Sequence, residues 1–493
     1  MTEKEDFLVQ KAYEEIEKYK VQVEKDPYRL NYHLMPPVGL LNDPNGLVQY
    51  KGTYHVFYQW NPFDTAHGAK FWGHYSTRNM VHWREEPIAL APSEWYERNG
   101  CYSGSAVEWE GKLYLFYTGN VKLDDGTRET YQCVAVSRDG VHFEKKGPFL
   151  KLPEGYTAHF RDPKVWWKNG CWYMVIGAQT VDGKGAAVLF SSEDMLSWRE
   201  LGRIAGEGMN GLSEFGYMWE CPDLICLDGK DVLLVSPQGL DPSGHFYHNL
   251  FQSGYFVGAL DYESAHFRHG PFTEIDRGFD FYAPQTFVDD KGRTILYGWM
   301  GITDENESYQ PTLAHRWVHA LTLPRELSLH GDKVYQRPLD ELCSLRKDRV
   351  DYKNVELTGT GTQFNGVEGS SVELRLDDIK VESGGFRIRF RREAELFYDC
   401  DKREMSLIRK NFKTGEPERR TCALSSLSQL TIFMDNSSLE IFVNEGEEVF
   451  TARYFPSLRD ETITFYGRAF FNLAKWDLDK LKIERNNAQR GVL

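Results

Sequence analysis

Five copies of a short motif divide most of the chain at almost constant intervals. In each copy a polar residue and a glycine are followed by an apolar run with strand character. The repeated glycines are Gly52, Gly111, Gly170, Gly229 and Gly292. The steps between them are 59, 59, 59 and 63 residues.

Units of this length, with about four short strands each, are typical of sheets arranged radially around an axis. Closing such a ring also protects the sheet edges that separate hairpins would expose. We therefore predict an all-β chain with a five-bladed β-propeller over residues 31–335. A β-sandwich with accidental regularity is the alternative.

The regions on either side of the repeats have different patterns. Residues 1–30 are highly charged and predict a helical extension, and residues 336–350 are interpreted as a linker. From 351 to 493 apolar and polar residues alternate, which predicts a β-sandwich with one wet face on each sheet. We expect the acids of this domain on solvated faces, and hence a structural role. Contact with carbohydrate is the alternative.

The composition excludes several classes of partner. The formal net charge of −15 argues against nucleic acid and anionic membranes, since both attract basic surfaces. No run approaches the ~18 apolar residues of a membrane helix, and no secretion signal is visible, so we predict a cytoplasmic location. The cysteines show no CxxC spacing, and Walker, GxGxxG and GxSxG motifs are absent. We expect no metal and no cofactor, and the oligomeric state stays open.

The side chains with the clearest chemistry stand eight to ten positions before the repeated glycines. They are Asp43, Tyr102, Ser103, Asp162, Glu220 and Tyr282. Asp43 and Asp162 directly precede a proline and Glu220 lies two positions before one; proline favours an extended backbone before it and suits the first residue of a strand. We therefore expect each acid at the entrance of a strand lining the central channel, where the three would converge. A single Asp-Pro pair would indicate no more than a turn.

Converging carboxylates suit the cleavage of a glycosidic bond. One acid must be protonated to assist the leaving oxygen, and another must be ionised to attack or to activate water. A third acid nearby would raise the pKa of its neighbour and favour a neutral proton donor. Arg161 is expected to keep the adjacent Asp162 ionised. The separation of the acids, which would decide between retention and inversion, is not given by the sequence.

Together, Leu41-Asn42-Asp43-Pro44-Asn45-Gly46, Arg161-Asp162-Pro163 and Glu220-Cys221-Pro222 resemble glycoside hydrolase family 32, the invertases and fructan hydrolases. The resemblance extends over nearly the whole chain. Within the family it is strongest to bacterial intracellular members that act on sucrose 6-phosphate. The family pairs a five-bladed propeller with a β-sandwich, retains the anomeric configuration and needs no metal.

The resemblance implies a role for each acid. Asp43 would be the nucleophile, Glu220 the general acid and base, and Asp162 the stabiliser of the transition state. The residues expected to form the sugar site are Leu40, Leu41, Asn42, Gln59, Phe71, Trp72, Tyr102, Ser103, Arg161, Tyr282 and Trp299.

The partner implied by the resemblance is a small sugar, either sucrose 6-phosphate, sucrose or a short fructan. An exo-acting fructan hydrolase and a non-catalytic sugar-binding propeller are the alternatives. A phosphate on the substrate would require a cation near the sugar site. The candidates are Lys70, His159, Lys164 and Arg316.

Overall fold

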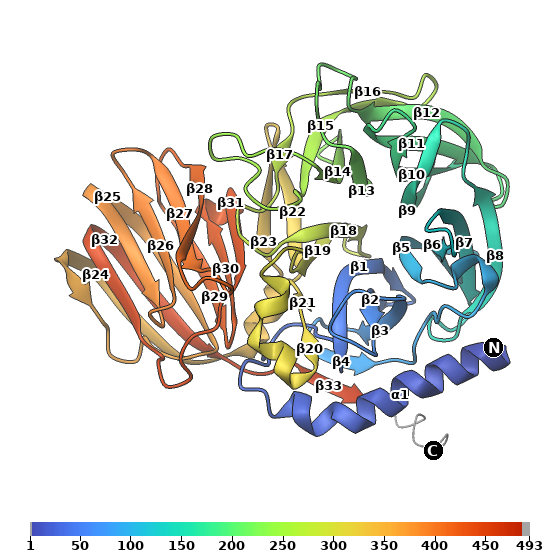
Figure 1. The fold of residues 1–493 in the computed structure, drawn as a ribbon. Helices are drawn as coiled ribbons and strands as arrows, with labels where there is room; N and C mark the ends of the chain where they lie inside the picture. The colour runs from blue at the N-terminus through green and yellow to red at the C-terminus, as the bar shows by residue number, and fades with distance from the viewer. Residues whose placement is uncertain (1, 486–493) are drawn as a thin grey trace.

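Strands dominate the computed structural model, which describes residues 2–485 and contains a β-propeller beside a C-terminal β-sandwich (Figure 1). The long helix α1 (Glu3–Glu24) lies along the outside of the propeller. Its Thr2 N-cap accepts a hydrogen bond from the Glu5 N–H, and its apolar side packs into the core of the first sheet.

The propeller is built from antiparallel sheets that follow one another along the chain. The first contains β1 (Gly39–Tyr50), β2 (Thr53–Asn61), β3 (Phe71–Thr77) and β4 (His82–Glu85). The second contains β5 (Cys101–Trp109), β6 (Lys112–Lys122), β7 (Arg128–Ser137) and β8 (Glu144–Lys151). The third contains β9 (Tyr156–Lys168), β10 (Cys171–Thr180), β11 (Gly185–Ser192) and β12 (Arg199–Gly206).

Two further sheets complete this series. The fourth contains β13 (Met218–Leu227), β14 (Lys230–Gln238), β15 (Gly254–Asp261), β16 (His266–His269) and β17 (Thr273–Glu274). The fifth contains β18 (Tyr282–Val288), β19 (Thr294–Met300), β21 (Ala320–Leu321), β22 (Arg325–His330) and β23 (Lys333–Pro338). The first strands of the sheets, β1, β5, β9, β13 and β18, contact one another in a closed cycle.

The repeated glycines form the turns between the first and second strands of the sheets. Lys51 and Gly52, for example, join β1 to β2 with φ of 49° and 74°. Two positive φ values in a two-residue loop define a type I′ turn, which matches the twist of the strands it connects. The turns at Gly111, Gly170 and Gly229 are of the same kind, and Gly292 lies in a longer loop.

The chain segment after β19 connects the last sheet of the propeller to the first sheet. β20 (Trp317–Val318) pairs in parallel with β1, whereas β21, a few residues later, pairs with β19. The final described strand, β33 (Lys482–Arg485), also returns to the propeller, where it pairs with β4 (Figure 1). The sequence placed this strand in the sandwich. It instead covers an edge of the first sheet that would otherwise be open.

The C-terminal strands form one continuous hydrogen-bonded set because two long strands take part in both layers of the sandwich. β25 pairs with β29 through its first residues and with β26 through its last. The strands are β24 (Arg346–Thr362), β25 (Val372–Phe390), β26 (Ala394–Asp399), β27 (Glu404–Lys410), β28 (Pro417–Ala423), β29 (Leu430–Asp435), β30 (Ser438–Val443), β31 (Glu448–Arg453) and β32 (Ile463–Leu478).

Short 3-10 helices occur in the connections. They are η1 (Trp95–Glu97), η2 (Glu307–Tyr309), η3 (Pro311–His315), η4 (Asp340–Leu345) and η5 (Asn444–Gly446). Of these, η4 lies between the last propeller strand and β24.

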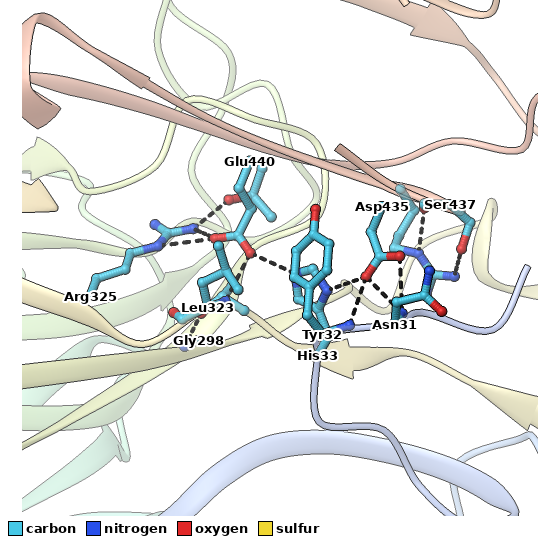
Figure 2. A network of polar contacts seen from close by, with 12 residues as sticks. Asn31, Tyr32, His33, Gly298, Leu323, Arg325, Asp435, Ser437 and Glu440 are labelled. Carbon is cyan, nitrogen blue, oxygen red and sulfur yellow. Dashed lines mark hydrogen bonds and ion pairs between the residues drawn. The ribbon is translucent and has the colours of Figure 1, made fainter. Parts of the chain in front are cut away.

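A buried network of charges joins the sandwich to the propeller (Figure 2). Glu440 of β30 accepts from Arg325 at 2.6 Å and from His33 at 3.0 Å. His33 also contacts Asp435 of β29 at 2.9 Å, and the side chains of these four residues are at most 1% exposed. The expectation that the acids of the sandwich are solvated is therefore wrong for Asp435 and Glu440. The propeller covers the face that the alternating pattern predicted to be wet.

Candidate active site

The first strand of each propeller sheet contains a β-bulge at the position of a predicted site residue. The pairing skips residues between Leu41 and Pro44, Tyr102 and Gly104, Arg161 and Lys164, Glu220 and Asp223, and Tyr282 and Gln285. A bulge leaves residues unpaired and re-aims side chains, and a proline there removes no ladder hydrogen bond. The acids were expected at strand entrances. They lie inside β1, β9 and β13, at or beside these bulges.

Asp43 is held by a closed ring of hydrogen bonds that links β1, β2 and β5. The Ser103 hydroxyl donates to Asp43 Oδ2 at 2.5 Å, and the Asn42 amide donates to Oδ1 at 3.0 Å. Gln59 connects the two donors, since it donates to Ser103 Oγ at 2.5 Å and accepts from Asn42 at 3.2 Å. The ring fixes the direction in which the Asp43 carboxylate points.

Asp162 and Cys221 bring the second acid next to the first. Asp162 has a φ of 68°, and its Oδ2 accepts from the Cys221 N–H at 3.0 Å. The Cys221 thiol lies 3.6 Å from Asp162 Oδ2 and 3.8 Å from Asp43 Oδ2. One thiol therefore contacts two carboxylates that are far apart in the sequence.

Glu220 is surrounded by donors on both carboxylate oxygens. Arg161 donates to Oε1 at 2.6 and 3.0 Å, whereas Gln238 and Tyr282 donate to Oε2 at 2.7 and 2.6 Å. Arg161 was expected to keep its neighbour Asp162 ionised; its charge does oppose the rise of that pKa, but its hydrogen bonds go to Glu220. The bulge turns the Asp162 side chain away, and the guanidinium extends across to Glu220.

The pKa values of the acids differ because only one of them contacts a cation. Burial raises the pKa of Asp162 to about 7, an effect that Arg161 opposes and the charges of Glu220 and Asp43 increase. Burial likewise raises the pKa of Asp43. Burial would also raise the pKa of Glu220, but the charge of Arg161 and the three donors outweigh it and lower this pKa. Glu220 is therefore the one acid of the three whose pKa is lowered.

The remaining predicted site residues divide into two groups. Tyr102 lies beside the charges of Arg161 and Glu220, and the Trp299 ring lies 6.2 Å from the Tyr282 ring. In contrast, four residues are at most 1% exposed and pack between strands, so their side chains do not line an open sugar site. They are Leu40, Leu41, Phe71 and Trp72. Trp72 acts indirectly, since its indole N–H donates to the Tyr102 carbonyl at 3.1 Å.

Two family models match consecutive parts of the chain. The N-terminal domain of glycosyl hydrolases family 32 matches residues 33–338, and the C-terminal domain of the same family matches residues 341–483. The chain belongs to glycosyl hydrolase family 32.

Similar proteins agree with this membership. The chain is 53% identical to the sucrose-6-phosphate hydrolase of Bacillus subtilis over 97% of its own length and 100% of that protein. It is 44% identical to the Klebsiella pneumoniae sucrose-6-phosphate hydrolase, with 93% and 95% covered. Among solved structures, a Lactobacillus gasseri sucrose-6-phosphate hydrolase matches with a TM-score of 0.85, 29% identity and coverage of 95% and 97%. A Bombyx mori β-fructofuranosidase variant in complex with sucrose matches with a TM-score of 0.82, 34% identity and coverage of 96% and 98%.

The sequence missed several residues that shape this family 32 site. Gln238 follows no motif, and only its pairing opposite Met218 places it against Glu220. The Asp162 N–H donates to the hydroxyl of Thr118, which lies on β6 in the neighbouring sheet, at 3.1 Å. Cys221 was visible between Glu220 and Pro222, but its contacts with two acids depend on the bulge. Such contacts between sheets have no signal in a single sequence.

Lys70 is a further cation near the site of this family 32 enzyme. The residue is 4% exposed, and its ammonium contacts His67 Nδ1 at 3.2 Å. Burial lowers the pKa of Lys70 to about 7, against the charges of Asp43 and Glu307. It therefore lies on the Asp43 side of the site.

Residues 2–485 contain no group of three or more His, Cys, Asp or Glu side chains arranged to hold a metal ion. Within the same range, no helix has the length and apolar character needed to cross a membrane.

Proposed function

We propose that this family 32 enzyme hydrolyses the β-fructofuranosidic bond of sucrose 6-phosphate and of sucrose, with retention of configuration. The observation that carries the proposal is the meeting of Asp43, Asp162 and Glu220 from three different sheets. The names of the similar proteins support the substrate class. The reaction would pass through a covalent fructosyl-enzyme, as retaining glycosidases require.

Asp43 acts as the nucleophile in this proposal. Two donors, Ser103 and Asn42, hold its carboxylate in one orientation, which favours attack on a bound anomeric carbon. Attack from one face of the fructose ring requires the leaving group to depart from the opposite face.

Glu220 acts as the general acid and then as the base that activates water. It must gain a proton, although the charge of Arg161 lowers its pKa. Asp162, with a pKa of about 7, is partly protonated near neutrality and can supply that proton. Fructose hydroxyls that donate to Asp162 would favour its ionised form, and the proton would move to Glu220. Asp162 then stabilises the transition state as a carboxylate.

Three structural statements belong with this proposal. We infer that each of the five propeller sheets is one blade, which the closed cycle of first strands supports. We divide the chain into a helical extension (1–30), a propeller (31–335), a linker (336–350) and a sandwich (351–493). Within the last range, β33 returns to pair with the first propeller sheet. The cytoplasmic location stays a prediction.

The substrate class is tested by measuring kcat/KM for sucrose 6-phosphate, sucrose and inulin on one purified sample. We expect the highest value for sucrose 6-phosphate and the lowest for inulin. The reverse order would replace the proposal with a fructan hydrolase.

The mechanism is tested with Asp43→Asn, which should abolish turnover because the amide is a poor nucleophile. Proton NMR of the parent reaction should show the β-anomer of the released fructose first. An unchanged rate in the variant, or first appearance of the α-anomer, would contradict the assignment of Asp43.

A further inference from the structure

The cations near the active site differ in how much of their charge is already neutralised. Lys164 donates to Asp223 at 3.0 Å and to the Thr286 carbonyl, so its charge is already paired. Arg316 lies over the ring of Tyr19 on α1, with Glu15 at 4.0 Å. Lys70 is buried on the Asp43 side. None of the three is free on the side of the leaving group.

That side is defined by Glu220, because the general acid must reach the glycosidic oxygen. Arg161 spans from Glu220 to His159, with its second terminal nitrogen 3.0 Å from His159 Nδ1. An arginine can only donate, so His159 Nδ1 is the acceptor in this contact. Neutral His159 then carries its proton on Nε2, which is available to donate to a ligand.

Arg128 lies at the start of β7, a strand that packs against β9, the strand of this pair's His159 and Arg161. Thr130 and Gln132 of β7 both donate from their side chains to the Phe160 carbonyl, at 2.9 and 3.1 Å. Residues two apart in a strand share a face, so Arg128 points from the same face as Thr130. Phe160 directly follows His159, which places Arg128 above the Glu220 side of the site.

The height of Arg128 above the site follows from the register. Tyr102 of β5 is opposite Thr118, which is opposite Gln132 of β7. β7 therefore begins four residues beyond the level of Tyr102. The Arg128 side chain is exposed, and no carboxylate in residues 2–485 forms an ion pair with it.

The charge of Arg128 affects the pKa values of two further side chains. Burial raises the pKa of the Tyr102 hydroxyl, and both Arg161 and Arg128 oppose this effect. Burial lowers the pKa of His159, and the same two guanidinium groups lower it further. Arg128 is thus close to both side chains.

We infer that Arg128, with His159 beside it, binds the phosphate of the glucosyl leaving group and selects phosphorylated sucrose over sucrose. A guanidinium fork matches a phosphate, and the His159 Nε2–H supplies a further donor. This inference rests on the proposed function, since it needs a leaving group on the Glu220 side. The ligand is a phosphate monoester on the six-position of glucose.

The test replaces Arg128 with methionine, which keeps an unbranched apolar stem and removes the charge. We expect kcat/KM for sucrose 6-phosphate to fall about 10- to 100-fold, the size of a lost charged hydrogen-bond pair. The value for sucrose should fall far less. Arg128→Lys keeps the charge but lacks the fork, and should give an intermediate loss. Arg138→Met is the matched control, because Arg138 is exposed just beyond the opposite end of β7.

Inhibition of sucrose hydrolysis separates this inference from the proposed function. Glucose 6-phosphate should inhibit the parent more strongly than glucose or inorganic phosphate at equal concentration, and Arg128→Met should remove the difference. Equal inhibition by glucose and glucose 6-phosphate in the parent would overturn the inference while leaving sucrose hydrolysis, and thus the proposed chemistry, intact. Equal losses for both substrates in Arg128→Met would also overturn it. If the parent hydrolysed neither substrate, the proposed function itself would fail.

Discussion

Two groups of buried carboxylates occur in this molecule, and their charges are neutralised differently. At the interface between propeller and sandwich, Glu440 contacts Arg325 and His33, and Asp435 contacts His33 (Figure 2). Asp276 contacts the same arginine at 3.0 Å. Every acid of this network therefore has a cation in contact.

The candidate active site also contains three acids, but fewer of them are in contact with a cation. Glu220 alone contacts a cation, Arg161, whereas Asp43 and Asp162 rely on neutral donors. Burial and mutual repulsion raise the pKa of both. A balanced network favours one rigid arrangement of domains, and an unbalanced one keeps a proton available for transfer. The same substitution, carboxylate to amide, should therefore have opposite consequences in the two places.

The largest effect is expected on activity, at Glu220. Glu220→Gln keeps the shape of the side chain and one of its two acceptor oxygens, but it cannot donate or accept the catalytic proton. We expect kcat/KM for sucrose to fall about 100- to 10,000-fold. Steady-state kinetics with Glu193→Gln, an exposed glutamate in a turn of the third sheet, give the control. Parent-like hydrolysis by Glu220→Gln would show that the proton donor is another group.

The next largest effect is expected on stability, at Glu440. Glu440→Gln leaves Arg325 and His33 buried with one counter-charge removed, which costs about 3–5 kcal/mol of unfolding free energy. Urea unfolding should show the loss, and any folded fraction should keep the KM of the parent. Glu356→Gln on an exposed face of β24 is the control. If both variants unfolded at the same urea concentration as the parent, the interface network would not stabilise the molecule.

The difference between the two groups also explains what the sequence could predict. The periodic glycines predicted the propeller, because a type I′ turn depends on local backbone chemistry. The Asp-Pro and Glu-Cys-Pro motifs predicted the three acids for the same reason. The pairing of Arg161 with Glu220 was not predicted, because a bulge decides which way each side chain points. Glu440 was expected in water, since alternation shows which face of a strand is apolar but not what covers the other face.

A smaller effect, of opposite sign, is expected at Asp162. Asp162→Asn removes a carboxylate whose pKa is raised to about 7, so at pH 8 it removes a charge that the fold disfavours. We expect a gain of up to about 4 kcal/mol, the value of a shift of about three pKa units, and a higher Tm. Turnover should fall, because the proton source and the transition-state charge are lost. Asp290→Asn, at an exposed turn, is the control, and a lower Tm for Asp162→Asn would contradict the unbalanced site.

The smallest expected effects are changes of stability with pH, which occur in different pH ranges for the two groups of carboxylates. Burial lowers the pKa of His33, but Asp435 and Glu440 outweigh it and raise this pKa above 6.5. The stabilisation from protonated His33 is thus complete below pH 6.5 and is lost as the pH rises through the folded pKa. The ionised form of Asp162 instead costs stability as the pH rises from its ordinary pKa of 3.8 to about 7.

Two variants show which residue causes each decline of stability with pH. In Tm measurements across pH, Asp162→Asn should flatten the decline between pH 4 and 7 and leave the decline at higher pH. His33→Gln should do the reverse, at a lower Tm throughout, because Asp435 and Glu440 lose their shared cation. Each pKa unit by which a group is shifted corresponds to about 1.4 kcal/mol, so the slopes are measurable. If His33→Gln kept the decline above neutral pH, the titrating group would lie elsewhere, and the interface would not be balanced by a charged histidine.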